Sequence, residues 1–387
     1  MTRDLRLVGT SLLCWGIGEG LFFIFLPLYL AQLGADPGQI GTVLGLMTAA
    51  MALTLIPAGV LADHFGRRVL MIAGWATGIV ACLGMFQARS LSMFIVAAVA
   101  YGFTGFVISP LNSYVISARG ALTPGRALGL IGSMYHTGAI VGALAGGLIA
   151  ERIGLRYVFL VASGLFVVST ALLFLTRHQP VEVTTGDHRY RPLLRNRPFG
   201  GLLLLAGLTI FALYLGTPLA PNFLQSVRGV PLAAMGAFGS VGELAIVISN
   251  QVLPRLGNRR GIVVAHVLVA LGLLSWWRGN SVVLFALGFF FKGAFQTVRI
   301  LVVAQADTLL ERAQIGLAYG VVDTVGSLML VVGAPIAGWL YEIDPSLPFR
   351  VGLVLTAVSL LAHLPGLRGE PVPEKMSAVP DPTSPDG

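Results

Sequence analysis

Six ionisable side chains lie within long apolar stretches of the sequence, where a charge is costly and therefore informative. A charged side chain at the middle of a bilayer costs at least about 2.5–3.5 kcal/mol on insertion scales. Carboxylates and an imidazole in such surroundings can exchange protons or bind a substrate. The six residues are Glu19, His136, Glu243, Lys292, Arg299 and Asp323. They predict a buried polar site with Glu19 as the first candidate acid and Asp323 as the next. Lys292 and Arg299 are candidates to neutralise Asp323 or Glu243.

The composition indicates that these stretches are surrounded by lipid. The 387 residues are 56% hydrophobic and only 11% charged, whereas soluble domains carry about 25% charged residues. A membrane-spanning helix needs about 20 apolar residues, and twelve runs reach or nearly reach that length. The runs cover residues 6–31, 39–62, 69–88, 91–115, 126–150, 157–176, 199–225, 231–254, 260–278, 281–306, 313–341 and 348–367. Because backbone groups in lipid must be satisfied within each segment, the runs predict an all-α integral membrane protein with twelve helices.

The distribution of basic residues predicts the orientation in the membrane. An even number of helices places both termini on one side. That side holds 17 of the 25 Lys and Arg residues, and the opposite side holds six. The positive-inside rule therefore predicts a multi-pass protein of the cell membrane with both termini in the cytoplasm. These loop charges explain the net charge of +8, so nucleic acid is not an expected partner.

The two halves of the sequence resemble each other at an offset of 191 residues. The matching pairs include Gly16 with Gly207, Pro27 with Pro218, Gly66 with Gly257, Gly102 with Gly293 and Glu151 with Glu342. A single offset on equivalent helices predicts two pseudo-symmetric six-helix halves in parallel repeat. The expected organisation is an N-terminal half at 1–176, a cytoplasmic linker at 177–198, a C-terminal half at 199–368 and a disordered tail at 369–387.

The loop between the second and third predicted helices reads GVLADHFGRR at 59–68. It resembles the loop signature of the major facilitator superfamily, and the resemblance extends over residues 5–368. The matching residues that the family uses as a conformational latch are Gly59, Asp63, Gly66, Arg67 and Arg68. The resemblance implies the fold of that superfamily, with twelve transmembrane helices in two six-helix pseudo-symmetric halves.

The resemblance implies that Asp63 holds two helices together at the cytoplasmic end. The eleventh predicted helix begins there, near Ala313, and the N-terminus of a helix carries partial positive charge. Gly59 allows the helices to approach closely. Arg67 and Arg68 are expected to pair with acids or with lipid head groups.

Two signatures of the proton-coupled drug exporters in this family are incomplete. Ala98 stands where those exporters carry an arginine, and Ala143 stands where their fifth helix carries a proline. The remaining glycines of that helix allow neighbouring helices to approach it closely, whichever substrate is transported. They are Gly138, Gly142, Gly146 and Gly147. The departures weaken the drug-exporter interpretation without removing it.

The family places the first, fourth, seventh and tenth helices around a central cavity, and the second, fifth, eighth and eleventh between the halves. All six of these ionisable residues fall in these eight helices, and the exception outside them is His266, near the cytoplasmic end of the ninth predicted helix. Each also has a structural interpretation. Glu19 can belong to an ion pair, and His136 can be a satisfied interface histidine. Glu243 and Asp323 can serve the packing between the halves.

The resemblance implies a secondary active transporter that moves one small molecule by alternating access, driven by protons. The scarcity of Asn in the helices favours export of an amphiphilic compound over uptake of a sugar or other metabolite.

Two other classes of membrane protein are disfavoured by the sequence. A multi-pass enzyme would need clustered His or Asp at one membrane face, and the sequence shows no such cluster. A channel would need a charge ring, and none is visible in the sequence. The only lysines, Lys292 and Lys375, stand outside any Walker A context, which excludes an ATP-driven pump of that class within this chain. We expect no metal and no cofactor. The expected partners are the substrate, protons and lipid around a monomer.

We predict that Asp63→Asn strongly reduces transport and leaves the amount of protein in the membrane unchanged. The substitution keeps the size of the side chain but removes the charge that attracts the terminus of the eleventh helix. Transport rates normalised to the amount of membrane-inserted protein measure the effect. A wild-type rate would refute the latch interpretation of residues 59–68.

Overall fold

The computed structural model describes residues 1–179, 197–307 and 315–364, and no strand occurs in these ranges. The side chains of residues 55–60, 63, 307 and 315–319 lie outside the description. The first half of the chain forms α1 (Arg3–Phe22), η1 (Phe23–Phe25), α2 (Leu26–Gln32), α3 (Pro37–Phe65), α4 (Arg67–Gln87), α5 (Leu91–Gly102), η2 (Phe103–Val107), α6 (Ile108–Ala118), α7 (Pro124–Arg152) and α8 (Arg156–Phe174). The second half forms α10 (Arg197–Leu215), α11 (Ala220–Ser226), α12 (Leu232–Val252), η3 (Leu253–Leu256), α13 (Asn258–Arg278), α14 (Val282–Lys292), α15 (Ala294–Asp307), α16 (Ile315–Ile343) and α17 (Leu347–His363).

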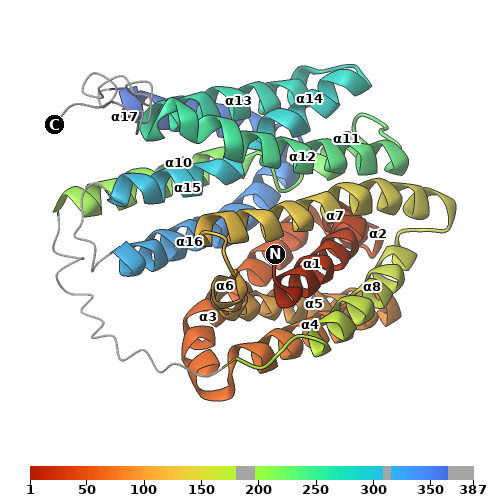
Figure 1. Cartoon of the computed structure of the whole chain (residues 1–387). Coiled ribbons are helices and arrows are strands. Elements are labelled where there is room, and N and C mark those ends of the chain that lie inside the picture. Colours follow the sequence, from red (N-terminus) through yellow and green to blue (C-terminus); the bar gives the residue numbers. More distant parts are fainter. Residues whose placement is uncertain (180–196, 308–314, 365–387) are drawn as a thin grey trace, which may run out of the picture.

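These helices correspond to the twelve apolar runs (Figure 1). Within the described residues, ten segments are long and apolar enough to cross a membrane, and α17 is a shorter apolar helix. The remaining run, 39–62, lies within α3. The prediction of an all-α membrane protein is confirmed. The boundaries of the halves, the linker and the tail stay predictions, because residues 180–196 and 365–387 lie outside the described residues.

Local sequence determines where several helices begin and end. At the start of α3, Asp36 Oδ1 accepts from the Gln39 amide at 2.7 Å, and the Gln39 side chain accepts from the Asp36 amide at 3.1 Å. This capping box satisfies amides that have no partner within the helix. α3 ends at Gly66 and η3 ends at Gly257, with φ angles of 86° and 87°. Glycine adopts this left-handed region without strain, so the repeat produces the same turn twice.

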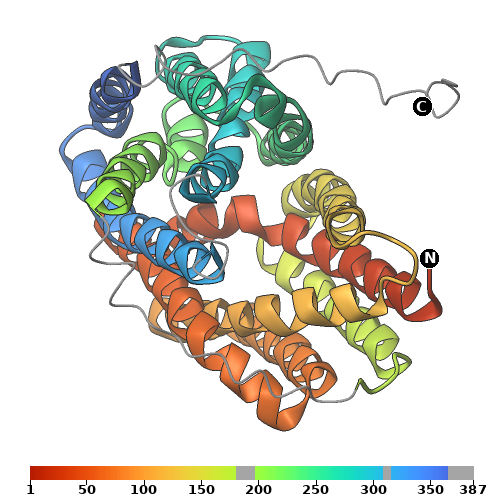
Figure 2. The same ribbon diagram turned by 60° about the vertical axis from the view of Figure 1, so that its left-hand side comes forward.

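The helices form two groups that follow the two halves of the chain. In both views the red to yellow-green helices lie together, and the green to blue helices lie together (Figures 1 and 2). The groups meet where α7 packs on α12 and where α3 packs on α16. Apolar side chains also point outward, with Val96 exposed by 71% and Leu204 by 79%. Lipid can cover such outward apolar side chains without the cost that water imposes.

A row of glycines brings α7 into backbone contact with α1. Gly138, Gly142 and Gly146 are spaced four residues apart and therefore share one face of the helix. A Cβ atom on any of them would overlap a backbone carbonyl oxygen of α1. Gly147 faces α12 instead, where a Cβ would lie 2.9 Å from the Leu232 carbonyl oxygen. The stripe therefore packs one helix against neighbours in both groups.

Among the described residues, the close contacts between the two groups gather at one end of the molecule. A Cβ on Gly236 of α12 would lie 2.5 Å from the Ala143 carbonyl oxygen of α7, and a Cβ on Gly41 of α3 would overlap the backbone of α16. Toward the opposite end of the same helices, no atom of the part of the chain that the structure describes lies within 4 Å of a Cβ position on Gly129 or Gly320. The molecule is therefore closed at one end and open at the end where α1 begins.

Two glutamates bind backbone amides across the closed end. Glu151 of α7 accepts from the Ala233 amide at the start of α12 at 2.6 Å. Glu342 of α16 accepts from the Gly38 amide at the start of α3 at 2.9 Å. The first amides of a helix lack hydrogen-bond partners and carry partial positive charge. Each carboxylate therefore accepts a hydrogen bond from such an amide and also balances the charge of the helix start. Because Glu151 and Glu342 are a matching pair of the repeat, the closure is pseudo-symmetric.

We predict that Gly142→Ala lowers the thermal unfolding temperature, whereas Gly129→Ala on the same helix leaves it unchanged or raises it. The added methyl group at Gly142 meets the Ile17 carbonyl oxygen and must push α1 away. At an open helix position, alanine is favoured over glycine by roughly 0.5–1 kcal/mol. Thermal unfolding of the purified proteins in detergent, followed by tryptophan fluorescence, measures both variants. Equal shifts would contradict the packing role of Gly142.

Candidate functional site

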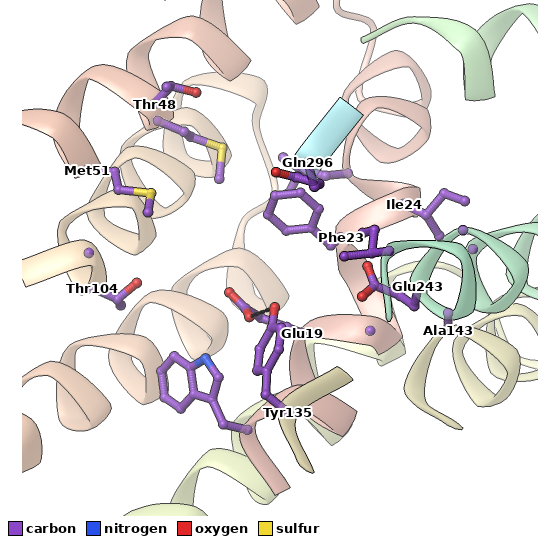
Figure 3. Close-up of a pocket in the computed structure, with 18 of the residues that line it drawn as sticks. Glu19, Phe23, Ile24, Thr48, Met51, Thr104, Tyr135, Ala143, Glu243 and Gln296 are labelled. Carbon is purple, nitrogen blue, oxygen red and sulfur yellow. Dashed lines mark hydrogen bonds between the residues drawn. The ribbon is translucent and has the colours of Figure 1, made fainter. Parts of the chain in front are cut away.

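A cavity of about 1000 Å³ lies between the two groups of helices. Its walls come from both halves of the chain, and most of the lining side chains are apolar or aromatic. Of the residues that the structure describes, three charged ones line it, namely Glu19, Glu243 and Lys292. Figure 3 shows Glu19 and Glu243 facing the same space from different helices. The cavity is large enough to enclose a drug-sized molecule.

Two tyrosine hydroxyls hold the carboxylate of Glu19. Tyr101 of α5 donates to Oε1 and Tyr135 of α7 donates to Oε2, each at 2.6 Å; Figure 3 shows the second bond. Hydrogen bonds to an ionised acceptor are stronger than bonds between neutral groups. A protonated carboxyl has a donor of its own, so one tyrosine would have to turn its hydroxyl. A proton on Glu19 therefore changes the bonding among α1, α5 and α7.

An aromatic cluster fixes the rotation of α1 near Glu19. Trp15, one turn earlier, stacks on Phe166 with ring centroids 3.9 Å apart and lies 4.7 Å from the ring of Trp75. Trp75 donates its indole N–H to the Ser169 hydroxyl at 2.5 Å. Because Trp15 and Trp75 are both buried, α1 cannot turn without disrupting this packing. The cluster thereby directs Glu19 toward the cavity.

His136 of α7 and Glu243 of α12 form a hydrogen-bonded pair across the two groups. The distance from Nδ1 to Oε2 is 2.8 Å, and the side chains are 23% and 29% exposed. One turn before Glu243, Ser240 donates to the Ile140 carbonyl at 2.6 Å, within the closed interface. Glu243 itself lines the cavity. The pair thus lies where the closed interface meets the cavity, and it must break if α7 and α12 separate.

The remaining intramembrane charges are paired unequally. Arg299 of α15 donates to Asp323 of α16 at 2.8 Å, and neither residue lines the cavity. Lys292 lines the cavity and makes no ion pair or hydrogen bond through its side chain with any residue that the structure describes. The expected pairing is therefore present between Arg299 and Asp323. Lys292 interacts electrostatically with Glu243 but forms no ion pair with it, because Glu243 binds His136.

The conformational latch expected at 59–68 is only partly described. The side chains of Gly59 and Asp63 lie outside the described residues, as do residues 308–314 before α16. Gly66 is buried and forms the left-handed turn between α3 and α4. The contact of Asp63 with the start of the eleventh helix stays a prediction.

The two arginines of the same loop bind protein groups within the first half. Arg67 donates to the Ser117 hydroxyl at 2.7 Å. Arg68 donates to the Phe174 carbonyl at 2.7 Å. They therefore connect the start of α4 to the ends of α6 and α8, and among the described residues they do not bind the acids expected for them.

The sequence identifies the acids of the cavity but not the groups that hold them. Tyr101 and Tyr135 are the donors to Glu19, and apolar periodicity gives no sign of that role. One signal does exist in the repeat. Tyr101 directly precedes Gly102, and Lys292 directly precedes the matching Gly293. Both Tyr101 and Lys292 line the cavity, so the position before this glycine marks the cavity wall in both halves.

Known proteins resemble this chain in sequence. The family model described as Major Facilitator Superfamily matches residues 8–274. An uncharacterised MFS-type transporter of Mycobacterium tuberculosis (strain ATCC 25618 / H37Rv) is 29% identical over 273 residues, or 66% of this chain and 64% of that protein. The match therefore spans less than two thirds of that relative. The multidrug resistance protein MdtG of Salmonella paratyphi A (strain ATCC 9150 / SARB42) is 26% identical over 289 residues, or 70% of this chain and 72% of that protein.

The fold also resembles solved structures. The crystal structure of a mutant of the nucleoside transporter NupG superposes with a TM-score of 0.80, covering 94% of this chain and 99% of that one. The sequence identity is 15%, so this likeness concerns the fold alone. It supports the arrangement of twelve helical segments described above.

We predict that His136→Leu and Glu243→Leu each destabilise the protein more than the double substitution does. A single substitution leaves a partly buried polar group without its partner, which costs about 1–3 kcal/mol, whereas the double variant leaves an apolar contact. Thermal unfolding of the four proteins gives the coupling energy. The exposed pair of Asp344 and Arg350 is the control, and its coupling is expected to be much smaller because water screens exposed charges. Strictly additive effects at His136 and Glu243 would contradict the prediction.

Proposed function

Because the chain belongs to the major facilitator superfamily, we propose that it is a proton-coupled secondary transporter of a small amphiphilic molecule. The observation that carries the proposal is the carboxylate of Glu19, which lines the cavity and accepts from Tyr101 and Tyr135. A carboxyl that is charged while the cavity faces one side, and neutral while it faces the other, carries one proton per cycle. The tyrosines connect that change to the positions of α5 and α7.

The unequal ends of the molecule support alternating access. Glu151 and Glu342 hold one end closed, while the other end is open. The reverse state requires both carboxylates to release their amides and the pair of His136 and Glu243 to separate. The open end must then close, and Asp63 is the residue that we assign to hold it. The positive-inside distribution assigns the open end to the cytoplasm, so this state is the inward-facing one.

The cavity lining supports an amphiphilic substrate. Trp15, Phe23 and Phe289 offer aromatic surface, and Met47 and Met51 offer flexible apolar surface. The relatives named as multidrug resistance proteins favour export as the direction. The ion pair of Arg299 and Asp323 does not line the cavity, and we assign it a structural role.

A second candidate is uptake of a metabolite by proton symport. Polar side chains also line the cavity, among them Thr48, Thr104 and Gln296 (Figure 3). Hydroxyl and amide groups can bind a polar solute by hydrogen bonds. The direction in which proton and substrate move relative to each other separates the two candidates.

We predict that Glu19→Gln abolishes accumulation driven by a pH gradient and keeps substrate binding and downhill exchange. Glutamine keeps the shape of the side chain but cannot release a proton. Proteoliposomes that contain a pH-sensitive dye are exposed to fluorescent amphiphiles of negative, zero and positive charge. Proton flux and probe accumulation are recorded with and without an imposed pH gradient.

Asp344→Asn serves as the control for this experiment. It removes a carboxylate outside the cavity lining and is expected to retain wild-type coupling. If Glu19→Gln still accumulates a probe against its gradient with unchanged pH dependence, Glu19 is not the proton carrier. The absence of proton-coupled flux for every probe in the wild type would overturn the transport proposal itself.

A further inference from the structure

Lys292 is the one charged residue of the cavity lining without a polar partner among the described residues. Glu19 binds two tyrosines, and Glu243 binds His136. The ammonium group of Lys292 makes neither an ion pair nor a hydrogen bond with the residues that the structure describes. A cation in an apolar setting is costly unless it is paired. Glu243, the carboxylate that acts on Lys292 electrostatically within the cavity, is already bound to His136, so a further anion beside Lys292 would be favourable.

The internal repeat indicates that the protein does not supply this anion at the matching position. In the first half, Tyr101 precedes the repeat glycine and binds Glu19 of the first helix. In the second half, Lys292 precedes the matching glycine, and the position that matches Glu19 is Ile210. Ile210 is fully buried and apolar. At these matching positions the second half therefore carries a basic group and no acid.

The helix break beside Lys292 fixes its place on the wall. α14 ends at Lys292, and α15 begins two residues later at Ala294. A Cβ on the intervening Gly293 would lie 2.5 Å from the Ala245 Cβ of α12 and 2.9 Å from the Ile246 amide nitrogen. Backbone contact thus holds the break against α12. The carbonyl end of α14 also favours a positive charge.

The remaining lining suits the apolar part of a ligand. Phe289 lies one turn before Lys292 on α14 and also lines the cavity. Trp276 lies beside it, with ring centroids 4.9 Å apart. A ligand that reaches Lys292 therefore meets aromatic surface around the charged group.

We propose that the cavity binds an amphiphilic organic anion, whose carboxylate or similar monoanionic group pairs with the ammonium of Lys292 while its apolar body packs on the aromatic wall. This inference rests on the proposed function of the cavity as the substrate site. It adds the chemical class of the substrate, which the acids of the cavity alone would not indicate.

The test uses three probes that share a dansyl group and differ in charge. They are dansyl-leucine, which is anionic, its methyl ester, which is neutral, and dansylcadaverine, which is cationic. Binding to the purified full-length protein in nanodiscs is followed by dansyl fluorescence, and the signal of empty nanodiscs is subtracted. Dansyl-leucine is expected to bind about tenfold more tightly than its ester, as a charge-assisted contact implies.

Variants then assign this preference to Lys292. Lys292→Met is expected to bind the ester as the wild type does and to lose the preference for dansyl-leucine. Lys292→Arg is expected to keep most of the preference for dansyl-leucine over its ester. Arg278→Met, which removes a positive charge outside the cavity lining, is the control and is expected to behave as the wild type.

Three results would overturn the inference. The first is a wild type that binds the ester or dansylcadaverine at least as tightly as dansyl-leucine, a result that needs no variant to fold. The second is a preference for dansyl-leucine that persists in Lys292→Met. The third is an equal loss of all three probes in a correctly folded Lys292→Met, which would make the role of Lys292 structural. Binding selectivity is measured without a proton gradient, so its failure is distinct from a failure of coupled transport.

Discussion

Backbone contact between the two groups at one end of the molecule is the constraint on which the cavity depends. α7 and α12 approach through Gly147 and Gly236, and α3 and α16 approach through Gly41. Helices that meet through larger side chains are usually 8–10 Å apart, and glycine allows a closer approach. Because the helices meet at one end and diverge toward the other, the space between them is open there. Glu151 and Glu342 bind helix starts at the same closed end, so packing and polar contacts favour one state together.

The positions of the helices were predictable because lipid leaves the backbone few choices. Apolar runs of sufficient length must be helical, and all twelve predicted runs lie over described helices for most of their length. Several runs are nevertheless interrupted: 6–31 forms α1, η1 and α2, 91–115 forms α5, η2 and α6, 199–225 forms α10 and α11, and 281–306 forms α14 and α15. These interruptions were not predicted. Gly293 between α14 and α15 illustrates the reason: it is needed because Ala245 of a distant helix lies against it. A sequence pattern records the apolar character of a segment but not the neighbour that forces a break.

The cost of a charge in lipid singles out six residues from the sequence, but not which of them line the cavity or how they pair. Glu19, Glu243 and Lys292 line it, whereas Arg299 and Asp323 do not. Which charge meets which depends on helix rotation, and this is determined by contacts such as the stacking of Trp15 on Phe166. The two halves also differ at matching positions, so the repeat predicts the scaffold and not the chemistry placed on it.

The first half places the acid Glu19 in the cavity, and the second half places the base Lys292 there. The charge of a substrate therefore affects whether it moves with the proton or against it. An anion bound at Lys292 is repelled by a charged Glu19 in the same cavity and not by a neutral one. Anion binding and protonation of Glu19 therefore favour each other, and the coupling is reciprocal. Under the proposed function, the proton and the proposed anion would then cross together, as in symport. A cationic substrate would compete with the proton for Glu19, and the two would move in opposite directions, as in proton-driven export. Lys292 on the wall opposes binding of a cation, so an anionic substrate, if it is bound as we propose, would favour the second candidate, proton symport, over proton-driven export.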